Sequence, residues 1–306
     1  MYFEGCLHIR DCQRPFVTDR DIERFKSAGG YNNDWELTYG MIKMFLNYIP
    51  PTKVIPIKLD NIPRIIKFLR FIGPQLQTTG NKLLAKKNVP RFLECRNQPD
   101  EKAHRPVLLF NQGELHTTNL IKRIFQEYYL GKEIFTQVYH RRTLLYDDKG
   151  YIDREEPFIT HQQLDQLQKK YKLGIVTGRP LVELEYSLRK FNLEKYFSVI
   201  VAQDDVVIEE VSYAKETSQP ISLGKPHPFS LLLAADQLGL KPDDGVAYLG
   251  DVTDDVLAAN AAKSSHPFVS VGVLQAAKDP LAAKHKFETA GADYVIERVS
   301  DVLNLF

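Results

Sequence analysis

Three short segments in the second half of the chain carry residue types that bind phosphate and divalent metal ions. Thr177 and Gly178 follow an apolar run, Lys225 stands just before a proline, and Asp251 is followed four positions later by Asp255. A threonine hydroxyl and a glycine N–H can donate hydrogen bonds to phosphate oxygens, and a lysine ammonium neutralises their charge. Carboxylates are hard oxygen ligands of the kind that Mg²⁺ prefers. These five residues are therefore a candidate phosphate and metal site.

Taken singly, each of the three segments has an ordinary structural interpretation. Thr-Gly is common in a turn that ends a strand, and Lys-Pro is common where a helix starts. Gly-Asp with a second Asp nearby is typical of a helix cap and a solvated first turn. Their order along the chain and their placement at strand ends and helix starts are more specific than any one of them. The interpretation as one site depends on that combination.

The elements that must position these residues are short strands alternating with helices, which begin after Tyr151. Apolar runs predict strands at residues 173–176, 198–202, 246–249, 268–273 and 293–296. This alternation predicts an α/β fold, with a parallel sheet and helices on both of its faces. Ligands of such sheets bind outside the carboxyl ends of the strands. Thr177 and Asp251 both stand near such ends.

The first half of the chain has a different pattern. Helical spacing of apolar residues predicts helices between residues 18 and 48, near 65–71, and again from Thr117 or Thr118. The segment from about residue 49 to residue 115 is rich in proline and breaks this pattern, so we expect an irregular insertion there. From Pro50 to Pro106 it carries twelve Lys or Arg and four acidic residues. Such charge either attracts anions to a site or forms an ordinary solvated surface.

Composition limits the class of protein. The 306 residues are 43% hydrophobic and 26% charged, with 40 basic and 39 acidic side chains, which suits a globular chain of two domains. The near-zero net charge gives no reason to expect nucleic acid or a membrane as a partner. Three cysteines without metal-ligand spacing indicate reduced thiols, and the sequence shows neither a signal-peptide pattern nor a membrane-length apolar run. We expect a cytoplasmic protein.

Together, the segments Ile175–Arg179, Gly224–Pro228 and Tyr248–Asp255 resemble the second, third and fourth motifs of the haloacid dehalogenase superfamily. The resemblance is to subfamily IA, which includes phosphoglycolate-phosphatase-like hydrolases. It implies a Rossmann-like α/β core at residues 156–306 and a helical cap domain at residues 1–155, which carries the insertion. It also implies Mg²⁺ as the cofactor and a small phosphorylated metabolite as the substrate.

The same resemblance assigns roles to the candidate residues. It implies that Thr177, Gly178 and Lys225 hold the phosphate, with Thr177 and Lys225 counted as catalytic, and that Asp251 and Asp255 place the Mg²⁺.

Residues 26–38 and 125–131 resemble helices of the cap, whose residues select the substrate in this superfamily. The candidates for cap contacts with the substrate are Asn32, Asn33, Asp34 and Thr38. The alternative interpretation is that these four are turn and helix-capping residues.

The resemblance also implies an aspartate nucleophile, in an Asp-x-Asp-Gly signature at the end of a first strand, and this sequence has no such signature. The missing strand is expected between those that end at Thr177 and Asp251. Residues 105–115 resemble a blurred version with Asn111 in place of the nucleophile, but a connecting strand or loop is the preferred interpretation. Three alternatives stay open: a start further upstream, another segment in the central position, or a degraded homologue.

Three functions are considered. The leading one is a Mg²⁺-dependent phosphatase for a small phosphorylated metabolite, inactive as written if the nucleophile is absent. The second is a catalytically dead pseudo-phosphatase that binds a phosphorylated ligand or partner. The third is a hydrolase of the haloacid dehalogenase type, which is less favoured because the two acidic residues after Gly250 suit a metal that carbon–halogen hydrolysis does not need.

Overall fold

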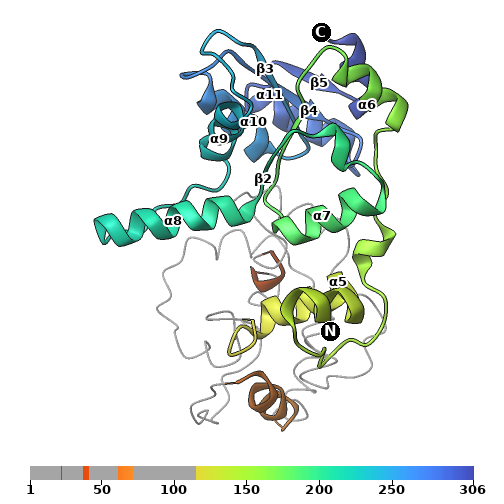
Figure 1. Ribbon diagram of the computed structural model, residues 1–306, viewed down its shortest axis with the longest axis vertical. Helices are drawn as coiled ribbons and strands as arrows, with labels where there is room; N and C mark the ends of the chain where they lie inside the picture. Colours follow the sequence, from red (N-terminus) through yellow and green to blue (C-terminus); the bar gives the residue numbers. More distant parts are fainter. Residues whose placement is uncertain (1–21, 23–36, 41–60, 72–114) are drawn as a thin grey trace. The chain divides into compact units, whose positions relative to one another are not determined.

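The computed structural model describes residues 22, 37–40, 61–71 and 115–306 (Figure 1). The chain divides into two compact units, Met1–Arg154 and Glu155–Phe306. This division falls one residue before the boundary expected from the sequence. The role of the first unit as a substrate-selecting cap stays a prediction.

The main described element of the first unit is α5 (Leu120–Tyr139), in the region where the sequence predicts a helix. Asn119 caps it, because Asn119 Oδ1 accepts a hydrogen bond from Lys122 N at 3.0 Å. The helix kinks at Gly131, whose φ of 71° lies in the left-handed region. A Cβ at this position would also overlap the backbone of Gly150, so the kink requires glycine.

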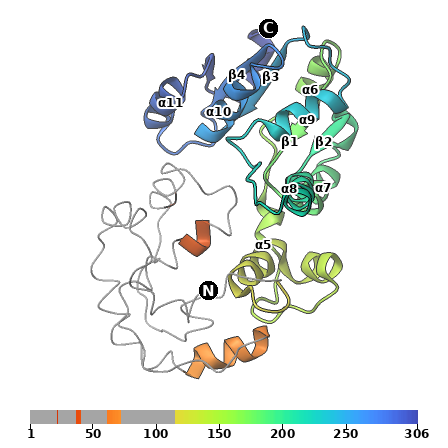
Figure 2. The same ribbon diagram turned by 90° about the vertical axis from the view of Figure 1, so that its left-hand side faces the viewer.

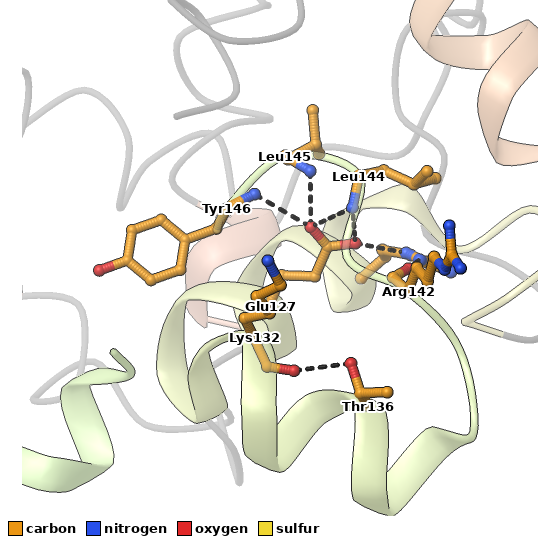
Figure 3. Close-up of polar contacts among 8 residues, drawn as sticks. Glu127, Lys132, Thr136, Arg142, Leu144, Leu145 and Tyr146 are labelled. Atoms are coloured by element: carbon orange, nitrogen blue, oxygen red, sulfur yellow. Dashed lines mark hydrogen bonds and ion pairs between the residues drawn. The ribbon is translucent and has the colours of Figure 1, made fainter. Parts of the chain in front are cut away.

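A buried carboxylate ties α5 to the loop that follows it (Figure 3). Glu127 is fully buried, and its oxygens accept hydrogen bonds from the backbone N–H groups of Leu144, Leu145 and Tyr146 at 2.7–3.2 Å. Arg123, which is also buried, donates to the same carboxylate at 2.6 Å. The buried carboxylate is therefore paired and hydrogen-bonded, which offsets the free-energy cost of its burial.

Two shorter helical pieces of the first unit are also described. Residues 62–71 form the helix that the sequence predicts near 65–71, with Ile62, Ile65 and Leu69 completely buried. Residues 37–40 are helical as well. The 3-10 helix η3 (Tyr151–Arg154) closes the unit.

The second unit alternates strands and helices, and this confirms the predicted α/β fold. Its five strands are β1 (Gly174–Val176), β2 (Val199–Val201), β3 (Val246–Gly250), β4 (Phe268–Val273) and β5 (Tyr294–Ile296). All pairings are parallel, β1 with β2, β3 with β4 and β4 with β5. Each strand begins and ends within one residue of the range that its apolar run predicts.

Helices cover both faces of the strands (Figures 1 and 2). The helices are α6 (His161–Gln168), α7 (Leu181–Lys190), α8 (Gln203–Thr217), α9 (Phe229–Gln237), α10 (Thr253–Ala262) and α11 (Pro280–Thr289), with the 3-10 turns η4 (Glu194–Tyr196) and η5 (Val299–Asn304). Alternation along β4 separates the two faces, since neighbouring strand side chains point opposite ways. Phe268 packs with α9 and α10, whereas Val271 packs with Leu167 of α6 and Val302 of η5.

In the part of the chain that the structure describes, β1–β2 and β3–β4–β5 form two separate sheets. β1 and β3 still lie near each other, because Val176 and Tyr248 pack against the same hydrophobic cluster and Tyr248 Oη donates to Val176 O at 3.3 Å. This is where the first strand is expected from the sequence. Asn111, the candidate within the blurred motif, lies outside the described residues.

Candidate functional site

Thr177 and Gly178 begin the loop after β1. Thr177 N donates to Val201 O at 2.9 Å, which continues the β1–β2 pairing by one residue. Thr177 Oγ1 accepts a hydrogen bond from Arg179 N at 3.1 Å, so the hydroxyl also shapes the turn. The next helix, α7, starts at Leu181. The loop therefore leaves the sheet immediately after the strand end, at the place predicted for a phosphate-binding turn.

A carboxylate from the start of the second unit holds this loop. Glu155 Oε2 accepts a hydrogen bond from Arg179 Nη1 at 3.2 Å and another from Ser187 Oγ at 2.9 Å. Lys190 Nζ donates to the backbone oxygen of Glu155 at 3.4 Å. Sequence reasoning missed Glu155, because one acid in an irregular stretch has no periodic or motif signal.

Lys225 and Asp255 form an ion pair, although 30 residues separate them in the sequence. Lys225 Nζ lies 2.6 Å from Asp255 Oδ1, and the side chains are 18% and 5% exposed. Solvent screens such a pair much less than a surface pair. The proline after Lys225 does not start a helix: α9 begins at Phe229, with Pro228 at the position before the first helical residue, and Pro226 lies in the preceding loop.

The position of Asp255 depends on the end of β3. Asp255 is buried in the first turn of α10, where its Oδ2 accepts a hydrogen bond from Val252 N at 3.3 Å. A Cβ on Gly250 would overlap the Asp255 side chain, so the close approach requires glycine at the strand end. Asp251 follows Gly250 directly and is exposed. One of the two candidate metal ligands is thus buried, and the other faces solvent.

Tyr248, which the sequence places at the start of the third segment without giving it a role, lies beside this ion pair. Its hydroxyl accepts a hydrogen bond from Lys225 Nζ at 3.0 Å and lies 3.1 Å from Asp255 Oδ1. Burial, followed by the charge of Asp255, raises the pKa of Tyr248, so the phenol keeps its proton at neutral pH. Burial alone would lower the pKa of Lys225, but its interactions with Tyr248 and Asp255 outweigh burial and raise it.

The metal and phosphate roles that the sequence predicts for Lys225, Asp251 and Asp255 stay a prediction. Mg²⁺ is commonly held by one or two carboxylates, with water and substrate phosphate as the other ligands. Asp251 and Asp255 supply carboxylates of this kind, four residues apart across the start of α10. Among the described residues, no group of three or more His, Cys, Asp or Glu is arranged to hold a metal.

The candidates for cap contacts fall in the first unit. Asn32, Asn33 and Asp34 lie outside the described residues. Thr38 belongs to the helical residues 37–40 and is half-buried. Substrate contacts for these four stay a prediction.

This chain is similar in sequence to several known proteins. Residues 159–268 match the family model described as haloacid dehalogenase-like hydrolase. Phosphoglycolate phosphatase of Escherichia coli (strain K12) is 32% identical to this chain over 117 residues, and that of Salmonella paratyphi A (strain ATCC 9150 / SARB42) is 36% identical over 117 residues. Each match covers 37% of this chain and 40% of the relative, so the chain spans less than half the length of these relatives.

One solved structure has a similar fold. An X-ray structure from the Northeast Structural Genomics Consortium superposes with a TM-score of 0.55 at 20% identity, covering 99% of this chain and 90% of that chain. At this identity the likeness concerns the fold alone. In the part of the chain that is described, no helix is long and apolar enough to cross a membrane.

Proposed function

We propose that this chain binds a small phosphorylated metabolite together with Mg²⁺ and hydrolyses its phosphate ester. The proposal starts from the match of residues 159–268 to the model of haloacid dehalogenase-like hydrolases. The observation that carries the proposal is the buried Lys225–Asp255 pair, 2.6 Å apart beside the end of β3. A lysine held this way is a fixed positive charge in a poorly screened place, which suits a phosphate group.

Each side chain has a distinct part in binding. The Lys225 ammonium has three N–H donors, and the described contacts direct it to Asp255 and Tyr248, so a third N–H can donate to a phosphate oxygen. The Thr177 hydroxyl and the Gly178 N–H are the proposed donors from the loop after β1. These groups bind and orient the phosphate.

Asp251 and Asp255 are the proposed ligands of the Mg²⁺. A carboxylate offers about four lone-pair sites, and Asp255 accepts hydrogen bonds from Lys225, Tyr248 and Val252, so one site is left for a metal. When bound, Mg²⁺ supplies positive charge that neutralises the phosphate oxygens. Asp251, exposed at the end of β3, provides the ligand nearest to solvent.

A second candidate function is phosphate binding without turnover. It is favoured by one observation, the absence from the 306 residues of an Asp-x-Asp-Gly sequence that would supply the expected nucleophile. In that case the same residues bind a phosphorylated ligand or partner.

Turnover of a generic aryl phosphate, with Mg²⁺ and with EDTA, tests the proposal, together with calorimetric titration of inorganic phosphate. Lys225→Met is expected to abolish activity and to weaken phosphate binding strongly, to a residual affinity. Lys263→Met is the matched control, because Lys263 also pairs with an aspartate, Asp293, but on the surface. Binding without hydrolysis would favour the second function. If wild type shows neither, or Lys225→Met behaves as Lys263→Met does, the proposed function is wrong.

A further inference from the structure

We propose that Tyr248 is a positioning residue whose hydroxyl holds the Lys225–Asp255 pair in a fixed place relative to the end of β1. The inference rests on the proposed function, because it concerns the same pair. It concerns a residue to which the motif resemblance gives no role, and that role acts through Lys225 and Asp255 rather than through contact with substrate.

The first observation is the place of Tyr248 between two sheets. β1 and β3 belong to separate sheets in the described part of the chain, so no backbone ladder there fixes one strand against the other. The Tyr248 hydroxyl bridges them by donating to Val176 O at 3.3 Å. Val176 immediately precedes Thr177, the proposed phosphate contact. A hydrogen bond from β3 therefore reaches the base of the loop after β1.

The second observation is that the same oxygen contacts both members of the ion pair. Lys225 Nζ donates to it at 3.0 Å, and Asp255 Oδ1 lies 3.1 Å away. A phenol has one proton to donate and lone pairs with which to accept. It accepts from Lys225, and its proton is shared between Asp255 Oδ1 and Val176 O. One hydroxyl thus couples the three segments that the proposed site needs.

The third observation is that the ring and the hydroxyl have separable roles. The Tyr248 ring packs with Val246 and Val176 against a cluster formed by α9, α10 and β4. A phenylalanine keeps this packing and removes only the hydroxyl. Tyr248→Phe is therefore a clean test of positioning, because the loss of hydrophobic burial is small.

Phosphate affinity, measured by calorimetry with inorganic phosphate and Mg²⁺, is the first readout. Loss of hydrogen bonds to a positioned charged pair is expected to weaken binding about three- to tenfold in Tyr248→Phe. The matched control is Tyr294→Phe, because Tyr294 is a strand tyrosine on β5 that stacks edge-on against Phe306. The control is expected to bind as wild type does.

A double-mutant cycle distinguishes positioning from general destabilisation. If Tyr248 acts through Lys225, Tyr248→Phe weakens phosphate binding in the wild-type background but has no further effect in Lys225→Met. Equal additional loss in both backgrounds would overturn the inference. So would binding by Tyr248→Phe within twofold of wild type.

If wild type binds no phosphate, the proposed function is wrong, but the positioning role of Tyr248 can still be tested. The measurement is hydrogen–deuterium exchange of residues 175–179. Loss of the Val176 contact is expected to speed exchange in this segment in Tyr248→Phe but not in Tyr294→Phe. Unchanged exchange would show that the hydroxyl does not hold the end of β1.

Discussion

Replacing Glu127 with alanine is expected to release the loop at residues 140–149 from α5. The carboxylate accepts hydrogen bonds from three consecutive backbone N–H groups of this loop (Figure 3). Alanine offers no acceptor, so these groups lose their partner. The substitution also removes the charge that Arg123 pairs with inside the protein.

The size of the effect follows from the burial of the pair. Removing one partner of a buried ion pair costs about 3–5 kcal/mol, because the other charge stays behind. Arg123 keeps a hydrogen bond to Arg142 O at 2.6 Å and a position 5.0 Å from the centre of the Phe135 ring. These contacts stabilise the remaining charge, so we expect the loss of local stability to be at the lower end of this range, about 3 kcal/mol. This corresponds to about 100-fold faster opening of the loop relative to closing.

Hydrogen–deuterium exchange by mass spectrometry is the direct assay, on peptides that span residues 142–149. The amides of Leu144, Leu145 and Tyr146 are expected to exchange slowly in wild type and about 100-fold faster in Glu127→Ala. Glu133→Ala is the matched control, since Glu133 lies exposed on the same helix. Unchanged exchange at the three amides would refute the assignment of Glu127 as their acceptor.

Three further predictions concern single sites. Gly250→Ala is expected to displace the Asp255 side chain, which an added methyl group would overlap, and to weaken Mg²⁺ binding in calorimetry at least about tenfold; unaltered binding would contradict the metal role of Asp255. Burial would raise the pKa of Asp293, but hydrogen bonds from Lys263 and β4 outweigh it and lower the pKa. Its contribution to stability is therefore present above the unfolded pKa of about 4 and lost as the pH falls through the lower folded value. Asp293→Asn should flatten the loss of stability below about pH 4 in urea denaturation, by less than about 1 kcal/mol for this partly exposed group; an unchanged pH profile would contradict this. Phe135→Ala should cost about 3–5 kcal/mol of unfolding free energy in the same denaturation experiment, because the ring is completely buried, and a loss below about 1 kcal/mol would show that the site repacks.

The strands of the second unit could be predicted because their signal is local. Each is a short and mostly apolar run, and burial on both faces of a parallel sheet favours such runs. Phe268–Val273 shows this clearly, since its predicted and observed bounds coincide. The start of α5 could also be predicted to within a few residues. The sequence predicts a helix from Thr117 or Thr118, whereas the side chain that caps α5 belongs to Asn119.

The sequence indicated some residues of the candidate site and missed others. Lys225 was notable as a charged residue between glycine and proline, and Asp255 as the second acid four positions after Asp251; the structure places Lys225 and Asp255 in contact. Tyr248 was missed because a tyrosine within an apolar strand is usually a core residue. Glu127 was missed because an acid in a helix is usually solvated, and its burial depends on a loop that folds back from 17 to 19 residues later.

The contact between Glu155 and Arg179 has a mechanical consequence. Glu155 is the first residue of the second unit, and its carboxylate holds the arginine two positions beyond Thr177. The same carboxylate also accepts a hydrogen bond from Ser187 of α7, so it connects the start of the second unit to the turn after β1 and to the helix that follows. The residue that joins the two halves of the molecule is therefore also an anchor for the proposed phosphate loop.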